Sequence, residues 1–276
     1  MKLLAIGDFH GRFPKKILKI IKKEKIDALL SNGDYLPFYY RKLWFKYCYG
    51  KDTELWEVIG KNKLKERIIR DLKAGERVFK QLNKLKIPVI TVLGNVDKGK
   101  WSEAVDMKRR KWSWEDQDFF APLFKKYRHI KDIQYSYTKL RDFIIIGGGP
   151  SSFPGKVKSK MYKKLLNLLK TNFKKFRKEN KEGKVIFLSH NVPYNTKLDK
   201  VGIQAHKAVR GKHVGSKLVR KVIDKFHPVI HIGGHIHESR GTQKLGKTLA
   251  INPGAIHEGH YAIINIEDGK AKVKLI

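Results

Sequence analysis

Aspartate and histidine recur in this sequence at short spacings that suit metal binding. One residue separates Asp8 from His10 and His235 from His237, and His190 follows an apolar run. The full candidate set is Asp8, His10, Asp34, Asn95, His190, His235 and His237. Carboxylate, amide and imidazole donors together suit Mn²⁺, iron, Zn²⁺ or Co²⁺ better than Mg²⁺ or Ca²⁺, which prefer oxygen alone. Seven donors are too many for one tetrahedral zinc ion and suit two metal ions that share a carboxylate.

Each of these side chains follows a short apolar run that predicts a buried strand. The runs cover residues 2–7, 27–33, 88–94, 184–189 and 228–234 and are rich in Ile, Val and Leu. Such runs, alternating with charged helical segments, are typical of an α/β sheet. In four of the five, glycine stands directly before the polar residue, where it permits a sharp strand exit. Because sites in α/β sheets form beyond the carboxyl ends of strands, we expect these side chains to meet there. Side chains two residues apart, such as Asp8 and His10, point the same way if the extended backbone continues.

The rest of the chain predicts helices between these strands and a second sheet. Amphipathic helices are expected over 14–24, 64–85 and 216–226. Further strands are expected over 134–137, 143–146, 249–252, 261–266 and 270–276. We expect these strands to form a second, partly antiparallel sheet from the C-terminal half. Without a repeat or a low-complexity linker, the sequence predicts one domain over residues 1–276.

Three segments, near 35–80, 98–130 and 156–184, are predicted to be insertions. The first is dense in aromatic residues between Tyr35 and Gly50, the second carries Trp101, Trp112 and Trp114, and the third is strongly basic and helical. Each is either an amphipathic cap packed on the core or a surface that faces the substrate. In the second case aromatic side chains stack on bases and basic ones neutralise phosphates.

The charge balance is strongly basic. Lys and Arg number 61 against 26 acidic residues, a formal net charge of +35. This excess indicates either a polyanionic partner such as nucleic acid or the general composition of the source proteome. The single cysteine, Cys48, excludes an internal disulfide and favours a cytoplasmic location. No run approaches the roughly 20 apolar residues of a membrane helix, and the sequence sets no oligomeric state.

The ordered set of motifs resembles the calcineurin-like metallophosphoesterase superfamily. The motifs are Asp8-Phe9-His10, Gly33-Asp34, Gly94-Asn95-Val96-Asp97, His190 and Gly234-His235-Ile236-His237. The resemblance implies a four-layer α/β/β/α sandwich of two mixed sheets. It also implies that Asp8, His10, Asp34 and His237 hold one divalent metal ion, and that Asp34, Asn95, His190 and His235 hold a second. Asp34 would bridge the two ions, and a hydroxide bridging them would attack the phosphorus of a phosphate ester in line.

One position departs from the family pattern. Many members have Gly-Asn-His-Asp, in which the histidine is thought to protonate the leaving group, and here Val96 replaces it. Asn95 and Asp97 remain candidate catalytic residues. His206 or His213 could replace the missing acid, and we take His213 as the candidate.

The loss of that histidine favours phosphodiesters over simple alkyl monoesters. The alternatives are a phosphomonoesterase or protein phosphatase, and a non-catalytic scaffold that kept the fold. A nucleic acid and an apolar, lipid-linked phosphate are the competing substrate classes. Further polar candidates near the site are Arg12, Asn32, Glu238 and Asn252.

Overall fold

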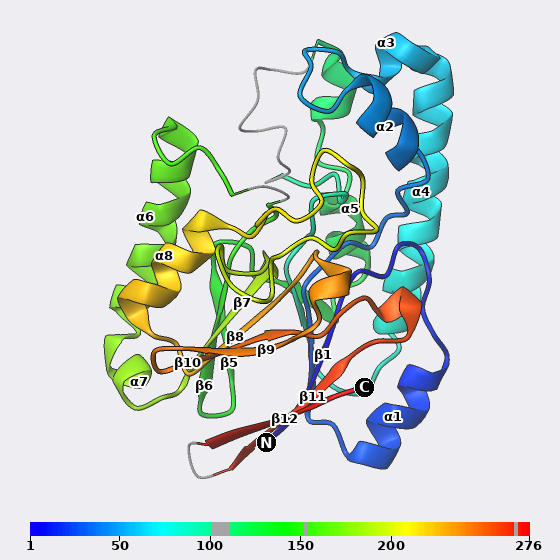
Figure 1. Cartoon of the computed structure of the whole chain (residues 1–276). Coiled ribbons are helices and arrows are strands. Elements are labelled where there is room, and N and C mark those ends of the chain that lie inside the picture. The colour runs from blue at the N-terminus through cyan, green and yellow to red at the C-terminus, as the bar shows by residue number, and fades with distance from the viewer. Residues whose placement is uncertain (101–110, 152–153, 268–269) are drawn as a thin grey trace.

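Two six-stranded sheets face one another in the computed structural model, which describes residues 1–100, 111–151, 154–267 and 270–276 (Figure 1). The first sheet consists, in order, of β12 (Lys270–Leu275), β11 (Ala262–Glu267), β1 (Lys2–Ile6), β2 (Ala28–Ser31), β3 (Val89–Thr91) and β4 (Ile130–Asp132). The second consists of β5 (Tyr137–Leu140), β6 (Phe143–Gly147), β7 (Val185–Asn191), β8 (Ile230–Gly234), β10 (Thr248–Asn252) and β9 (Gly241–Leu245). Each sheet contains both parallel and antiparallel pairs, as predicted.

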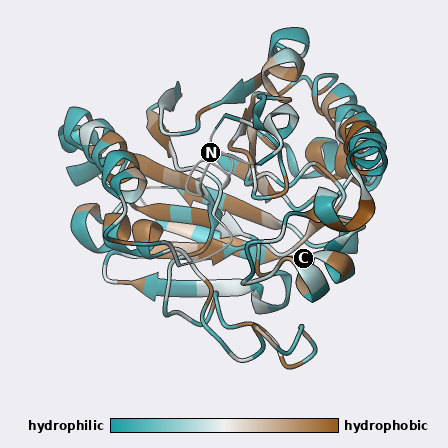
Figure 2. Cartoon of the chain, turned by 90° about the horizontal axis from the view of Figure 1, so that it is seen from above, coloured by the Kyte–Doolittle hydropathy of each residue, from teal (hydrophilic) through white to brown (hydrophobic). Residues whose placement is uncertain are grey.

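Alternation along the central strands explains the layers. In β1, Leu3 and Ala5 pack into the core between the sheets, while Leu4 and Ile6 face the helices outside the first sheet. Both faces of the strand are therefore buried, which accounts for its continuous apolar sequence. Helices α1 (Lys16–Glu24), α4 (Lys61–Leu82) and α5 (Ala121–Lys126) cover the first sheet, and α6 (Lys160–Lys175), α7 (Arg177–Lys181) and α8 (Lys217–Phe226) flank the second. Figure 2 shows the brown strands between teal outer helix surfaces, and the predicted four-layer sandwich is confirmed.

The helices α2 (Arg41–Tyr47) and α3 (Leu55–Ile59) lie above the carboxyl ends of the strands with the start of α4 (Figure 1). Their interior consists of Cys48, Leu55, Leu64 and Ile68, surrounded by aromatic side chains. Trp112 and Trp114 pack against the same cluster, while Trp101 lies outside the described residues. This part of the chain is a small cluster, rich in aromatic side chains, beside the strand ends.

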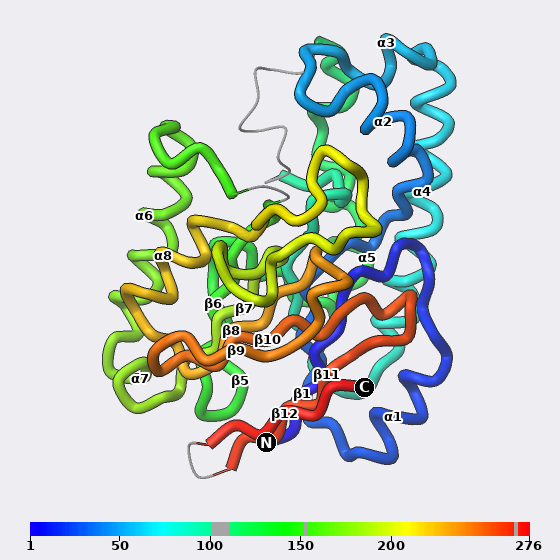
Figure 3. Tube along the Cα trace, in the orientation of Figure 1, coloured from blue at the N-terminus to red at the C-terminus, as the bar shows by residue number. Residues whose placement is uncertain are grey.

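The C-terminal strands differ from the prediction. β11 and β12 do not extend the second sheet but join the first, where Leu3 of β1 pairs with Ile264 of β11 in antiparallel register. The hydrogen bonds of this pairing cover the edge of β1 that β2 leaves open. Both chain ends consequently lie away from α2 and α3 (Figure 3), and the Met1 amino group donates to the Ile266 carbonyl at 2.8 Å.

Three smaller differences have local causes. The strand expected at 134–137 begins only at Tyr137, because Tyr135 has a positive φ of 50° and turns the chain. The sequence did not indicate β4, of which only Ile130 is buried, or β9, which has no fully buried residue. Within the described ranges, no helix has both the length and the apolar character that crossing a membrane requires.

A buried histidine joins the two strands that carry the later motifs. His231 of β8 is fully buried, and its Nε2 lies 2.8 Å from the Ser189 hydroxyl on β7, which itself donates to the Asn191 carbonyl. The ring therefore donates to Ser189 and stays neutral. Burial lowers the pKa of His231 from 6.5 to about 3.

We expect His231 to make the fold sensitive to acid. Below pH 6.5 the unfolded chain binds a proton at this ring and the folded chain does not, so stability falls as the pH drops toward 3. At about 1.4 kcal/mol per pKa unit, wild type should lose about 2 kcal/mol more than His231→Gln between pH 7 and pH 5 in urea unfolding. His129→Gln, at an exposed histidine, is the control and should follow wild type. Parallel curves for wild type and His231→Gln would contradict this account.

Candidate metal centre

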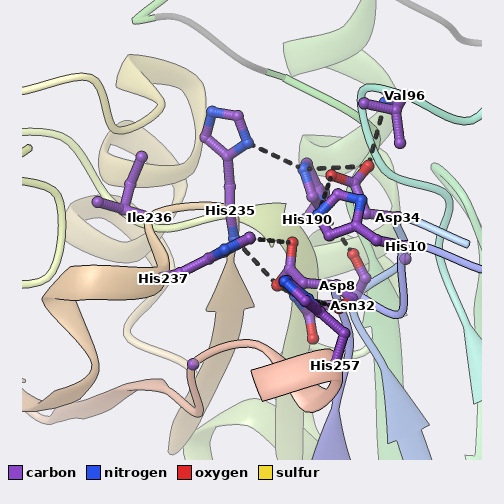
Figure 4. Close-up of polar contacts among 12 residues, drawn as sticks. Asp8, His10, Asn32, Asp34, Val96, His190, His235, Ile236, His237 and His257 are labelled. Atoms are coloured by element: carbon purple, nitrogen blue, oxygen red, sulfur yellow. Dashed lines mark hydrogen bonds and ion pairs between the residues drawn. The ribbon is translucent and has the colours of Figure 1, made fainter. Parts of the chain in front are cut away.

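The carboxyl ends of β1, β2 and β3 from one sheet meet those of β7 and β8 from the other (Figure 4). All seven predicted donors come together at this junction: Asp8, His10, Asp34, Asn95, His190, His235 and His237. The junction opens into a cavity of about 370 Å³. Its lining consists of His10, Arg12, Asp34, Pro37, Phe38, Tyr39, Arg41, Asn95, Val96, His235, His237, Glu238, His257 and Glu258.

The strand exits turn sharply rather than continuing as extended backbone. Asp8, His10, Asp34 and His235 have positive φ angles of 54°, 45°, 57° and 73°. The expectation that Asp8 and His10 align through strand alternation is therefore corrected, because β1 ends at Ile6. Left-handed backbone at non-glycine residues costs about 1–3 kcal/mol each and is typical of functional sites. Here it turns the side chains into the junction.

Glycines before the donors leave room for neighbouring carboxylates. A Cβ atom on Gly94 would lie 2.0 Å from Oδ1 of Asp34, and one on Gly234 would lie 2.6 Å from Oδ2 of Asp8. No side chain fits at these distances. The glycines noted in the sequence thus serve close packing of the donors across strands.

The donors form groups that overlap at shared residues. Within each group the donor atoms lie within 4.8 Å of one another. The groups are Asp8 with His10 and Asp34, His10 with His237 and His257, and Asp34 with His190 and His235. We name the first two together the Asp8 cluster and the third the His190 cluster.

Asp34 belongs to both clusters and lies between the histidines of one and those of the other. Its Oδ1 is 3.7 Å from Nε2 of His190, and its Oδ2 is 4.0 Å from Nε2 of His10. The backbone N–H of Val96 donates to Oδ1 at 3.0 Å and helps to hold the carboxylate in place. One oxygen thus faces each cluster, which is the placement that a shared ligand of two cations requires.

Backbone carbonyls fix two imidazoles with their Nε2 atoms toward the site. Nδ1 of His10 lies 3.1 Å from the Leu36 carbonyl, and Nδ1 of His190 lies 2.8 Å from the Asn32 carbonyl. A carbonyl only accepts, so each Nδ1 carries a proton. In its neutral form each ring then presents a lone pair at Nε2. Nε2 of His190 then faces Oδ1 of Asn95 at 2.7 Å. Two lone pairs that face each other are the arrangement of two ligands of one cation.

The carboxylate of Asp8 has one oxygen atom without a hydrogen-bond donor among the described residues. It is fully buried; its Oδ2 accepts from Asn32 and from the N–H of His235, but its Oδ1 accepts no hydrogen bond from any described residue. Nε2 of His237 lies 3.3 Å from that oxygen. Burial alone would raise the pKa of Asp8, but the surrounding histidines, above all His237, outweigh it and hold the pKa below its usual range. A divalent metal ion fits this donor set.

Two of the three histidines of the Asp8 cluster, His10 and His237, have opposite pKa shifts. Burial lowers the pKa of His10 to about 4, so that ring is neutral. Burial would also lower the pKa of His237, but Asp8 and Glu258 outweigh it and raise the pKa to about 10. A metal ion that binds His237 must therefore displace a proton, and its affinity should fall in acid.

Asp97 holds the chain after β2 in place. Its Oδ2 accepts from the N–H groups of Asp34 and Gly94 at 2.9 and 2.8 Å, and its Oδ1 from those of Tyr35 and Leu36 at 2.8 and 3.1 Å. Both oxygens of the buried carboxylate are thus occupied. In place of the catalytic role predicted for Asp97, this geometry supports a positioning role for it toward Asp34.

The predicted substitutes for the missing acid lie elsewhere. Nδ1 of His213 is 2.6 Å from Oδ1 of Asp199, a carboxylate that also accepts from the N–H groups of Thr196 and Gly215. His206 stacks on Phe45 with ring centroids 4.5 Å apart. Neither histidine lines the cavity. The structure thus gives no support to the predicted catalytic role of His213.

His257 and Glu258 belong to the site, although the sequence analysis did not select them. They follow the Asn252-Pro253-Gly254 turn after β10. Asn252 was the only residue of this turn that the sequence suggested as a candidate. Nδ2 of Asn252 donates to the Ile236 carbonyl at 2.8 Å and so supports the segment that carries His237. The sequence signal available was a histidine shortly after a strand end in a glycine-containing turn.

Comparison with known proteins identifies the family. A model of calcineurin-like phosphoesterases matches residues 1–239, and the chain belongs to this family. An uncharacterised protein of Methanocaldococcus jannaschii (MJ1162) is 29% identical over 259 residues, covering 92% of this chain and 88% of that protein.

Solved structures show the same fold. One crystal structure with 20% identity has a TM-score of 0.69 and covers 99% of this chain and 98% of its own. The protein TT1561 of Thermus thermophilus, with 16% identity, has a TM-score of 0.55 and covers 99% and 97%.

We expect Gly94→Ala to displace Asp34. Its Cβ atom would lie 2.5 Å from the Asp34 nitrogen and closer still to the carboxylate, an overpacking that costs about 1–3 kcal/mol. Urea unfolding should show this loss, and Mn²⁺ affinity measured by calorimetry should fall with it. The matched control is Gly241→Ala, whose Cβ atom would make ordinary contact at 3.5 Å. Equal stability and Mn²⁺ affinity in the two variants would argue against the packing described.

Proposed function

We propose that this protein is a phosphoesterase that uses two divalent metal ions and prefers phosphodiesters. The observation that carries the proposal is the position of Asp34, with one carboxylate oxygen toward each donor cluster. Asp8, His10, Asp34 and His237 would hold one ion, and Asp34, Asn95, His190 and His235 the other. When bound, such ions lower the pKa of water and neutralise charge on phosphoryl oxygens. The mixed oxygen and nitrogen donors favour manganese, iron, zinc or cobalt.

Among the described residues, the cavity lining supplies the ligand geometry but has no acid at position 96, where many relatives carry one. In their neutral forms, His10 and His190 present Nε2 lone pairs toward the ions, because backbone carbonyls accept from their Nδ1–H groups. Val96 lines the cavity where many relatives carry the acid, and a valine transfers no proton. Alkyl monoesters need protonation of a poor leaving group, whereas a diester with a better leaving group needs less. This supports the preference for diesters.

The cavity rim supports an anionic substrate with a flat apolar group. Arg12 and Arg41 are exposed at the rim, and the Arg41 guanidinium lies over the Phe45 ring, 5.6 Å from its centroid. Tyr39, whose surface is 68% exposed, lines the same cavity beside Phe38. Guanidinium groups bind phosphate and aromatic faces stack on bases. With the net charge of +35, these features favour a nucleotide or nucleic acid over a lipid-linked phosphate. The single, buried cysteine suits a reducing compartment, and we propose a cytoplasmic location.

The first test compares two chromogenic esters after reconstitution with Mn²⁺. We expect wild type to hydrolyse bis-p-nitrophenyl phosphate faster than p-nitrophenyl phosphate. Asp34→Asn should lower the diester rate by at least about 100-fold, because one shared ligand serves both ions. Asp224→Asn, on the exposed face of α8, is the matched control and should keep wild-type rates.

Each other outcome of this test has a definite meaning. Hydrolysis of the monoester alone would replace the proposal by a phosphomonoesterase. Turnover that survives Asp34→Asn would sink the shared-ligand account. No turnover on either ester, with two ions bound, would favour a non-catalytic scaffold.

The rim arginine should act on substrate binding. Arg41→Ala removes a charged partner of the phosphate, and hydrogen bonds to charged groups contribute about 1.5–3 kcal/mol. We therefore expect KM for bis-p-nitrophenyl phosphate to rise about tenfold or more, with a smaller change in kcat. Arg77→Ala, at an exposed arginine of α4 that does not line the cavity, is the control. An unchanged KM for Arg41→Ala would exclude this residue from substrate binding.

A further inference from the structure

His257 lies in the short 3₁₀ turn Ile256–Glu258, which follows β10 and reaches over the end of β1. Its Nδ1 is 2.8 Å from the backbone carbonyl of Asp8. Since the carbonyl can only accept, Nδ1 carries the proton and a neutral His257 presents its lone pair at Nε2. Hydrogen bonds from Nδ1 to backbone carbonyls orient the rings of His10 and His190 in the same way.

The His257 ring packs directly against the other two histidines of the Asp8 cluster, His10 and His237 (Figure 4). Its centroid is 4.8 Å from that of His10, edge to face, and 5.4 Å from that of His237. One nitrogen atom from each of the three rings lies within 4.8 Å of the others. Three imidazole nitrogens gathered in this way form a group of potential metal donors. One of these rings, His237, also has its Nε2 3.3 Å from Oδ1 of Asp8, an oxygen that accepts no hydrogen bond from a described residue.

Glu258 does not account for the orientation of His257. Its Oε1 lies 3.6 Å from Nε2 of His257, longer than a hydrogen bond. The same oxygen is 3.5 Å from Nδ1 of His237, and the other is 3.6 Å from Nδ1 of His260. Glu258 therefore lies 3.5–3.6 Å from one nitrogen of each of three rings and makes no close hydrogen bond to any of them.

We propose that Nε2 of His257 is a further ligand of the metal ion held by Asp8, His10, Asp34 and His237. The inference rests on the proposed function, because it assumes that this ion binds. It extends the ligand set beyond the seven residues that the sequence motifs supply. A third imidazole makes this position richer in nitrogen than the His190 cluster, which has two histidines. Nitrogen-rich sites favour Zn²⁺, Co²⁺ or iron over Mn²⁺, so the two positions should differ in metal preference.

The test is Co²⁺ binding by His257→Asn. The asparagine amide can still donate to the Asp8 carbonyl, so the variant removes Nε2 while keeping the local hydrogen bond. Metal-free protein is titrated with Co²⁺ and followed by calorimetry and by visible absorption. We expect wild type to bind two ions. In His257→Asn, one of them should bind at least about tenfold more weakly, with an altered absorption spectrum. His260→Asn makes the same change three residues along and is the matched control, which should match wild type.

The outcomes separate this inference from the proposed function. Two ions bound to His257→Asn with the affinities and spectrum of His260→Asn would overturn the ligand role of His257 and leave the proposed function standing. A wild-type protein that binds no Co²⁺ would overturn both. Thermal unfolding of the metal-free variants checks that they are folded. If His257→Asn is unfolded, His257→Gln replaces it and is held to the same criterion.

Discussion

Two buried carboxylates at the junction of two sheets set the constraint on which the rest of this structure depends. Asp8 is fully buried and Asp34 is 3% exposed, so together they place negative charge where water reaches very little of it. Burying such charges without compensation costs far more than the net stability of a domain. Histidines surround both residues, yet one oxygen of Asp8 remains without a hydrogen-bond donor among the described residues. The site is therefore built to receive positive charge.

The fold supplies this junction through its least regular backbone. The strands themselves are ordinary, with apolar residues on both faces. Apart from His190, which lies near the end of β7, the donors stand on the turns just past the strands. Left-handed conformations at Asp8, Asp34 and His235 are strained and are held by contacts from other elements. Asp97 is the clearest example, because its carboxylate binds the N–H groups of residues after both β2 and β3. Contacts of this kind fix the positions of the donors relative to the core strands.

Much of the fold and site could be predicted because the signals are local. Each of the five motif-bearing strands is an apolar run, and each motif follows it directly in the sequence. The features that the sequence did not predict depend on contacts between segments far apart in the chain. Nothing near Ala262 indicates that β11 pairs with β1, and nothing near His257 indicates that its ring reaches Asp8. His213 was chosen from its position after His190, but in the structure its ring pairs with Asp199 and does not line the cavity, so its catalytic role stays a prediction.

The central claim is that two metal ions share the carboxylate of Asp34. Anomalous diffraction from crystals of the Mn²⁺-loaded protein, recorded near the manganese absorption edge, tests it most directly. The account predicts two peaks, about 3.5–4 Å apart, with the Asp34 carboxylate between them and Asp8 and His190 on opposite sides. A single peak, or two peaks of which neither contacts Asp34, would contradict it.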